Sequence, residues 1–411
     1  MLLEFRVENY KSFKEDILFT MEAAADKKHL NNLTDTGKFR ILKTSVIYGA
    51  NASGKTKLIE AVGLMGAFVR NSHAHLSNTR LSYHPFAFDD ISKSSPTCFQ
   101  IKFLKNDVLY DYSFSYNSTE IVKESLYFYP KGKVAAIFER NGQEFNFVKE
   151  KGKQKLLSER VKKESLYLSV AHQFNYSPVK EAFEWLTNDL LVLLGTDSGR
   201  SLDVLLDKMI VDPKFRERVN RAFRIADLGI ISVKDKGRIS RRPEKDVYYP
   251  EPQLAFEIED IWVDHTTVGR DGKNITAELP LCQESSGTIQ FISTIGSVID
   301  ALELGSTLVV DDIDVNFHHE LCKWILGLFH DTEENPKGAQ LIFNTHDVEL
   351  MDLDEIRRDQ VWFTDKDWET GISSLRSLSE YKERNDRDIR RSYINGRYSA
   401  KPFISTERLM K

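Results

Sequence analysis

Residues 49–56 read GANASGKT, which matches the spacing G-x-x-x-x-G-K-[ST]. The backbone N–H groups of such a loop can surround a phosphate group. Lys55 can then reach the β- and γ-phosphates, and the Thr56 hydroxyl can bind Mg²⁺. The residues predicted to contact a nucleotide here are Gly49, Asn51, Ser53, Gly54, Lys55, Thr56 and Lys57.

A structural glycine turn is the competing interpretation of this motif, and the flanking sequence argues against it. The apolar run TSVIYG precedes the loop and predicts a buried strand. After the loop, apolar residues recur at helical spacing. They are Leu58, Ile59, Val62, Met65 and Val69. Strand, tight loop and helix is the order that a phosphate-binding loop requires.

Such a loop also needs a carboxylate to hold its metal ion, and the run TLVVDDID places acids at the end of an apolar strand. Asp311 is the predicted metal ligand together with Thr56, and Asp312 is placed to orient or deprotonate the attacking water. A solvated acidic turn is one alternative. A second is that Asp312 and Asp314 form the metal-binding pair of a Toprim nuclease, although the sequence shows no separate Toprim sheet.

A histidine follows the next apolar strand, in LIFNTHD. The imidazole of His346 could hydrogen-bond a γ-phosphate, and an ordinary loop histidine is the alternative. Lys55, Asp312 and His346 together form the predicted catalytic set. His318 and His319 lie at a helix start with no third metal ligand in the sequence nearby, so packing or capping is expected of them.

The stretch ESSGT is a second helix start that contains a glycine. Ser286 and Gly287 precede an apolar helix face, so its free N–H groups and positive dipole end form a second potential anion site. That face consists of Phe291, Ile295, Val298, Ile299 and Leu302. Each chain has one phosphate-binding loop, which contacts one side of the γ-phosphate. Another surface must therefore contact its far side. A second copy of the chain is the economical source of that surface, which predicts a homodimer around ATP.

The order of the expected elements predicts an α/β fold. The opening LLEFRVENY alternates like a half-buried strand, and residues 83–129 carry the turn-separated pattern of an antiparallel sheet. The segments STLVVDD, HHELCKWILGLFHD and AQLIFNTHD read as strand, helix and strand of a covered parallel sheet. The expected divisions are 1–148 (first part of the head, with the P-loop and the antiparallel sheet), 149–231 (an inserted helical subdomain), 232–379 (second part of the head) and 380–411 (a basic tail).

Composition narrows the class of protein. The net charge of −5 gives no global positive field for nucleic acid, so such binding would depend on local patches at 149–163, 234–242 and the arginine-rich tail. Solvated charged faces explain those patches as well.

Cys98, Cys282 and Cys322 lack metal or disulfide spacing and indicate reduced thiols. The charged opening residues do not match a signal peptide or anchor, so a cytoplasmic protein without membrane contact is expected.

These motifs together resemble the ABC-type ATPase heads of the RecF and structural-maintenance-of-chromosomes group. More narrowly, the chain resembles the compact bacterial AAA family ATPases of the RloA and AbiL type associated with phage defence. The resemblance covers nearly the full length. It is carried by FRVENYKSFKE, GANASGKTKL, PFAFDD, IVKESLYFY, ESSGT, VVDDID with HHEL, FNTHD, and RRSYINGRYSAKPFI.

The resemblance implies an ABC-type ATPase head, with a P-loop parallel sheet, an antiparallel β subdomain and an inserted helical subdomain. It implies ATP and Mg²⁺ as cofactors, Ser286 and Gly287 at the γ-phosphate of the partner's ATP, His346 as a switch, and Asp314 in a loop that crosses the dimer interface. Asp312 stands where this group usually has glutamate, which implies slow hydrolysis. The metal-sensing glutamine has no clear counterpart, and HPFAFDD is the candidate region.

The expected function is that of an ATPase sensor or scaffold in antiviral, toxin–antitoxin-like defence, a homodimer or higher oligomer that controls a separately encoded Toprim-like nuclease or similar toxin. One alternative is an ATP-driven DNA-repair clamp of the RecF kind. The other is a nuclease in its own right.

Overall fold

The computed structural model describes residues 1–195, 198–226, 229–235, 261–269, 271–315, 317–381 and 388–398. The chain forms two compact units. The first comprises Met1–Gly195, Ala301–Asp314 and Cys322–Lys411, and the second comprises Thr196–Asp300 and Val315–Leu321. The expected helical region 149–231 is therefore divided between the two units, at Gly195.

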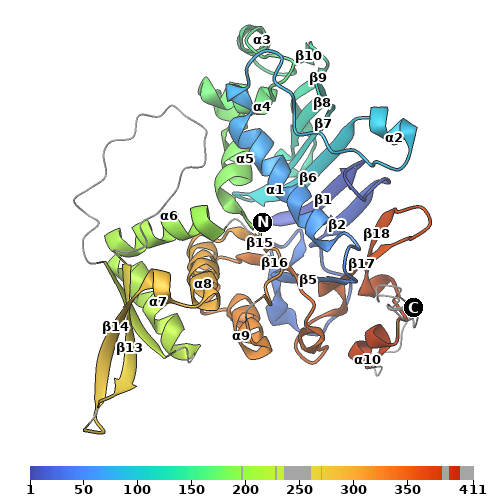
Figure 1. Cartoon of the computed structure of the whole chain (residues 1–411). Coiled ribbons are helices and arrows are strands. Elements are labelled where there is room, and N and C mark those ends of the chain that lie inside the picture. The colour runs from blue at the N-terminus through green and yellow to red at the C-terminus, as the bar shows by residue number, and fades with distance from the viewer. Residues whose placement is uncertain are drawn as a thin grey trace, which may run out of the picture. The chain divides into compact units, whose positions relative to one another are not determined.

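The first unit contains an antiparallel sheet with the strand order β10-β9-β8-β7-β6-β1-β2 (Figure 1). Its strands are β1 (Leu2–Glu8), β2 (Ile17–Thr20), β6 (Thr97–Lys105), β7 (Val108–Tyr116), β8 (Ile121–Phe128), β9 (Ala135–Asn141) and β10 (Glu144–Asn146). The alternation predicted for the opening strand is confirmed, because Leu3, Phe5 and Val7 are buried. The predicted antiparallel sheet is confirmed as well, and it extends through β9 and β10.

The same unit contains the P-loop sheet, with the order β11-β15-β16-β5-β17-β18. Its strands are β11 (Leu190–Leu193), β15 (Thr307–Val310), β16 (Gln340–Asn344), β5 (Thr44–Gly49), β17 (Val361–Lys366) and β18 (Ser373–Ser377). All neighbours are parallel except β17 and β18. The predicted strand, helix and strand correspond to β15, α9 (His319–His330) and β16, so the acidic and histidine-bearing ends meet at one edge.

Helix α1 (Lys55–Asn71) packs against both sheets. The Phe68 ring lies 4.6 Å from the Tyr116 ring of β7, and a side chain at Gly63 would contact Val192 of β11 at 3.4 Å. The apolar α1 residues predicted to face the core are all buried, namely Leu58, Ile59, Val62, Met65 and Val69. The helix that follows the P-loop is thus fixed on two sides.

One predicted helical stretch is a strand in the structure. The run EAFEWLTNDLLVLL reads as a single helix in sequence, but it divides into α5 (Lys180–Glu184), a π-helical turn (Trp185–Asp189) and β11. β11 pairs in parallel with β15, from Leu190 opposite Thr307 to Leu193 opposite Val310. Tertiary pairing with the sheet edge overrides the helical propensity of the leucines.

The remaining elements of the first unit are short. They are β3 (Leu33–Asp35), β4 (Arg40–Leu42), α2 (Asp90–Ser94), α3 (Lys151–Ser158), α4 (Tyr167–Gln173) and α10 (Ile389–Ile394). A buried ion pair joins two neighbouring strands of the antiparallel sheet, β8 and β9. Glu124 of β8 lies 3.5 Å from Arg140 of β9, and it also accepts the backbone N–H groups of Tyr167 and Leu168 at the start of α4.

In its described residues, the second unit consists mainly of three helices and a three-stranded sheet. They are α6 (Ser198–Val211), α7 (Pro213–Ile225), α8 (Ser286–Leu304), β12 (Ile230–Asp235), β13 (Ile261–Val268) and β14 (Asn274–Pro280). Within this unit, the Phe291 ring of α8 packs 5.3 Å from the Phe223 ring of α7.

The basic patch predicted at 234–242 lies outside the described residues beyond Asp235. The described helices include none with the length and apolarity that a membrane span needs.

Candidate nucleotide site

The P-loop connects β5 to α1 through a backbone that requires glycine. Gly54 has a φ of 118°, which L side chains rarely adopt. A side chain at Gly49 would lie 2.3 Å from Thr364 Oγ1 and 2.5 Å from Ser53 Oγ. Glycine is therefore required at these two positions for different reasons. Gly54 has a backbone conformation that other residues rarely adopt, and Gly49 lies too close to β17 for a side chain.

The P-loop lysine is buried in its own loop. Only 5% of Lys55 is exposed, and its Nζ donates to the carbonyl oxygens of Gly49 at 2.9 Å and Ala50 at 3.2 Å. Burial lowers the pKa of Lys55, while the carboxylates of Asp312, Asp311 and Asp314 raise it. A partly desolvated cation in this position favours a bound polyanion.

The first strand-end acid faces the loop threonine. Burial raises the pKa of Asp311 most strongly, and the neighbouring Asp312 adds to the effect. Hydrogen bonds from Asn344 and Thr56 act in the opposite direction. Asn344 Nδ2 donates to Asp311 Oδ1 at 2.6 Å, and Asn344 Oδ1 accepts the backbone N–H of Asp312. The side-chain amide of Asn344 thus hydrogen-bonds both the Asp311 carboxylate and the Asp312 backbone. The sequence did not indicate this role.

The next two acids, Asp312 and Asp314, each have a buried oxygen that no described residue satisfies. Asp312 has a φ of 50°, and its Oδ1 is buried without a hydrogen-bond partner among the described residues. The same holds for Asp314 Oδ1. Among the described residues no group of three or more His, Cys, Asp or Glu could hold a metal by itself. One carboxylate and one hydroxyl, completed by phosphate oxygens and water, is the donor set typical of Mg²⁺ at a nucleotide.

The predicted switch histidine lies beside these acids. His346 follows β16, and its backbone N–H donates to Asp314 Oδ2 at 3.2 Å, while its side chain is exposed. His318 Nδ1 accepts the backbone N–H of Glu320 at 3.3 Å in the first turn of α9. This bond is the capping role expected for His318.

Other predicted nucleotide contacts have partners within the protein. Ser53 Oγ lies 2.6 Å from Thr364 Oγ1, and Lys57 Nζ donates to Glu60 at 2.9 Å. Lys11 also donates to Glu60. Asn51 is exposed. Lys11 belongs to the motif FRVENYKSFKE, but its position beside the first turns of α1 became apparent only from the structure.

Ser286 and Gly287 are the first two residues of α8, in the second unit. Ser285 caps this helix, since its Oγ accepts the backbone N–H of Thr288 at 3.1 Å. The predicted helix start is therefore confirmed as local structure, and Ser286 is exposed on it.

The C-terminal helix α10 contributes to the P-loop, which the sequence analysis did not anticipate. The Tyr393 hydroxyl accepts the backbone N–H of Gly49, and burial raises the pKa of Tyr393. Its ring lies 5.6 Å from the Phe363 ring of β17. Arg390 in the same helix pairs with Glu349 at 2.7 Å and Asp352 at 3.6 Å, in the segment after His346. Residues 388–398 of the predicted basic tail therefore pack against the head.

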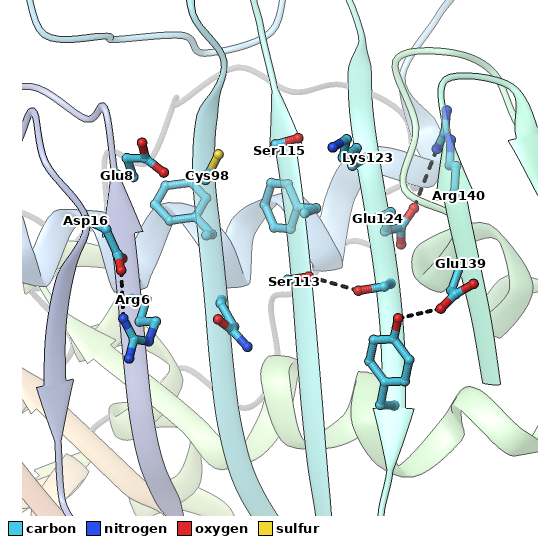
Figure 2. A pocket seen from close by; sticks show the side chains of 15 residues that line it. Arg6, Glu8, Asp16, Cys98, Ser113, Ser115, Lys123, Glu124, Glu139 and Arg140 are labelled. Carbon is cyan, nitrogen blue, oxygen red and sulfur yellow. Dashed lines mark hydrogen bonds and ion pairs between the residues drawn. The ribbon is translucent and has the colours of Figure 1, made fainter. Parts of the chain in front are cut away.

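A hollow of about 510 Å³ lies on the outer face of the antiparallel sheet (Figure 2). Its side chains largely pair with one another. Arg6 lies 2.6 Å from Asp16, Ser113 lies 2.9 Å from Ser125, and Tyr127 donates to Glu139. The charged residues that line it are Arg6, Lys123 and Arg140 against Glu8, Asp16, Glu124 and Glu139. This face does not have the excess of positive charge typical of a nucleic-acid surface.

A P-loop at the carboxyl edge of a mostly parallel sheet, facing an acidic strand end and joined to an antiparallel sheet, defines an α/β protein with the fold of an ABC-type ATPase head. The family described as "AAA domain, putative AbiEii toxin, Type IV TA system" matches residues 45–352, and the chain belongs to this family.

Solved structures that match include the SMC head domain from Thermotoga maritima. That match has 12% sequence identity and a TM-score of 0.41, and it covers 92% of this chain and 98% of that one. Among curated proteins, none matches the chain in sequence.

The contact between Tyr393 and Gly49 generates a prediction. Tyr393→Phe removes the acceptor of a P-loop N–H group, so we expect ATP affinity to fall about threefold to tenfold, in proportion to one hydrogen bond. Isothermal titration with a slowly hydrolysed ATP analogue measures this. Tyr127→Phe is the matched control, since its hydroxyl bonds to Glu139 on the outer sheet face. Equal affinities for the two variants would contradict the role of Tyr393.

Proposed function

We propose that this chain binds and hydrolyses ATP with Mg²⁺, and that it acts as an ATP-gated head which controls a separate effector. The observation that supports this most is the meeting of four groups at one sheet edge. Lys55 is buried in the P-loop, Thr56 hydrogen-bonds Asp311, and Asp312 is the carboxylate that acts most strongly on Lys55. Membership of an AAA family supports the same activity.

In the proposed reaction, the P-loop N–H groups and Lys55 bind the β- and γ-phosphates. Thr56 and Asp311 would hold Mg²⁺, which supplies charge neutralisation at the phosphate oxygens. Asp312 orients the attacking water and accepts its proton. Asn344 fixes the Asp312 backbone, so the carboxylate is held in place before the nucleotide arrives. His346 would contact the γ-phosphate and report its presence.

We further propose a homodimer in which Ser286 and Gly287 of one chain contact the ATP of the other. The exposed, capped start of α8 supports this, because free N–H groups at a helix start attract a phosphate. Each nucleotide would then be held by two chains, and ATP would control their association. Asp314, hydrogen-bonded to the His346 backbone, would lie at that interface.

The effector is proposed to be a separately encoded nuclease of Toprim type or a similar toxin, in a system of antiphage defence. The description of the family refers to a putative toxin and a toxin–antitoxin system, which supports this setting. A nuclease activity of the chain itself is less favoured, because Asp311 and Asp312 already face the P-loop. The mixed charge of the outer sheet face gives no support to a DNA clamp.

The P-loop assignment predicts that Lys55→Ala weakens ATP binding about 10- to 100-fold, because it removes charge-assisted hydrogen bonds to phosphate. Titration with a slowly hydrolysed ATP analogue measures the loss. Lys93→Ala, which removes a surface lysine paired with Asp90, is the control and leaves affinity unchanged. Unchanged affinity in Lys55→Ala would contradict the assignment.

The shared site predicts complementation between two inactive variants. A Lys55→Ala chain mixed with a Gly287→Asp chain forms heterodimers with one complete site, whereas each variant alone has none. Trapping of labelled nucleotide in the mixture, compared with each parent, tests this. No recovery in verified heterodimers would exclude Ser286 and Gly287 from the partner's site.

The role of Asp312 predicts that Asp312→Asn keeps ATP binding but lowers turnover about 100-fold or more, since an amide cannot accept the proton of water. Asparagine tolerates the φ of 50° at this position, so the loop keeps its shape. Phosphate release under single-turnover conditions measures the step. Wild-type turnover would show that another group activates the water.

A further inference from the structure

Two aromatic side chains stand exposed on a turn and a loop of the first unit. Phe88 precedes α2 and is 70% exposed, and Trp368 lies in the turn between β17 and β18 and is 67% exposed. Lys366, the last residue of β17, places its Nζ 6.0 Å from the centre of each ring. We refer to Phe88, Lys366 and Trp368 as the aromatic platform.

The turn that carries Trp368 is held by its own hydrogen bonds. Asp367 Oδ1 accepts the backbone N–H groups of Glu369 at 3.0 Å and Thr370 at 2.8 Å. The Asp367 carbonyl accepts the N–H of Gly371 at 2.7 Å. Trp368 therefore lies on a fixed turn, and its exposure does not come from a loose segment.

The Phe88 ring is held in place by its neighbours. Its ring lies against Gly371, where an added side chain would come within 2.5 Å of it. The buried Phe86 ring meets it edge-on, at 5.5 Å and 88°. Asp89 caps α2 directly after it. Large apolar rings that are exposed on a well-defined backbone indicate a binding surface.

The platform flanks the P-loop. Ser373, two residues after Gly371, lies 3.0 Å from the position of a side chain at Gly54, and its N–H donates to the Ser12 carbonyl at 2.8 Å. The N–H of Lys11 donates in turn to the His84 carbonyl at 2.7 Å. The turn between β17 and β18 and the loop before α2 thus both connect to the side of the P-loop (Figure 1).

We propose that the aromatic platform stacks the base of the nucleotide whose phosphates the P-loop holds. This rests on the proposed function. The P-loop contacts phosphates only, and one ribose joins them to the base, so a surface that holds the base must flank the loop. Aromatic faces stack on bases, and a nearby ammonium adds a cation–π attraction. Two rings suit one base, whereas a stable protein interface needs about 800 Å² per partner.

The test compares two ligands that differ only in the nucleoside. Phe88→Ser and Trp368→Ser, alone and combined, are titrated with a slowly hydrolysed ATP analogue and with inorganic triphosphate, each with Mg²⁺. We expect ATP affinity to fall about tenfold or more in the double variant, with triphosphate affinity unchanged. Phe174→Ser, which removes a 44% exposed ring beneath Arg160, is the control and changes neither affinity.

Fluorescence gives a second readout that does not depend on the serine variants. ATP should quench the emission of wild-type protein, inorganic triphosphate should not, and Trp368→Phe should lose the quenching while it keeps ATP affinity.

Four outcomes would overturn the inference. In the first, the serine variants keep wild-type ATP affinity. In the second, they keep it but lose self-association, which would make the platform a protein interface. In the third, wild-type protein binds neither ATP nor triphosphate, which would contradict the proposed function as well. Binding of triphosphate and ATP with equal affinity would reject the platform alone.

Discussion

A lysine ammonium that is withdrawn from water needs partners, and this requirement organises the nucleotide edge of the head. Lys55 donates to two carbonyl oxygens of its own loop, and the acids that follow β15 supply the balancing negative charge. The strand order places β16 between β15 and β5, so Asn344 at its end can hold Asp311 on one side while the P-loop lies on the other. The position of each charged group therefore follows from the topology of one sheet.

The parts of the fold that the sequence predicted are those governed by local pattern. The alternation around Leu3, Phe5 and Val7 gave a strand, and the fixed spacing of Gly49, Gly54 and Lys55 gave a loop between strand and helix, because both patterns are set within a few residues. The parts that it missed depend on distant partners. β11 becomes a strand through pairing with β15, more than a hundred residues later. Asn344 and Tyr393 act through contacts with Asp311 and Gly49 that no local pattern reveals.

The backbone at Asp312 gives a physical reason for a short carboxylate at this position. A φ of 50° is tolerated better by aspartate than by glutamate, because this backbone conformation favours short polar side chains. A shorter side chain held in this conformation reaches less far toward an attacking water. We propose that turnover is slow for this reason, which suits a task that depends on how long ATP stays bound. The helix α10 contacts both the first P-loop glycine and the segment after His346, so it joins the two ends of the same site.

The pairing of β5 also has a consequence for how the protein is made. β5 is synthesised early, yet its neighbours in the sheet, β16 and β17, are made only after residue 340. While the nascent chain emerges from the ribosome, β5 has unpaired edges on both sides and the P-loop lacks the strand ends that balance Lys55. Such edges favour misassociation between chains during translation. The proposed nucleotide site is complete only after nearly the whole head has been made, so ATP would bind after these strands have paired.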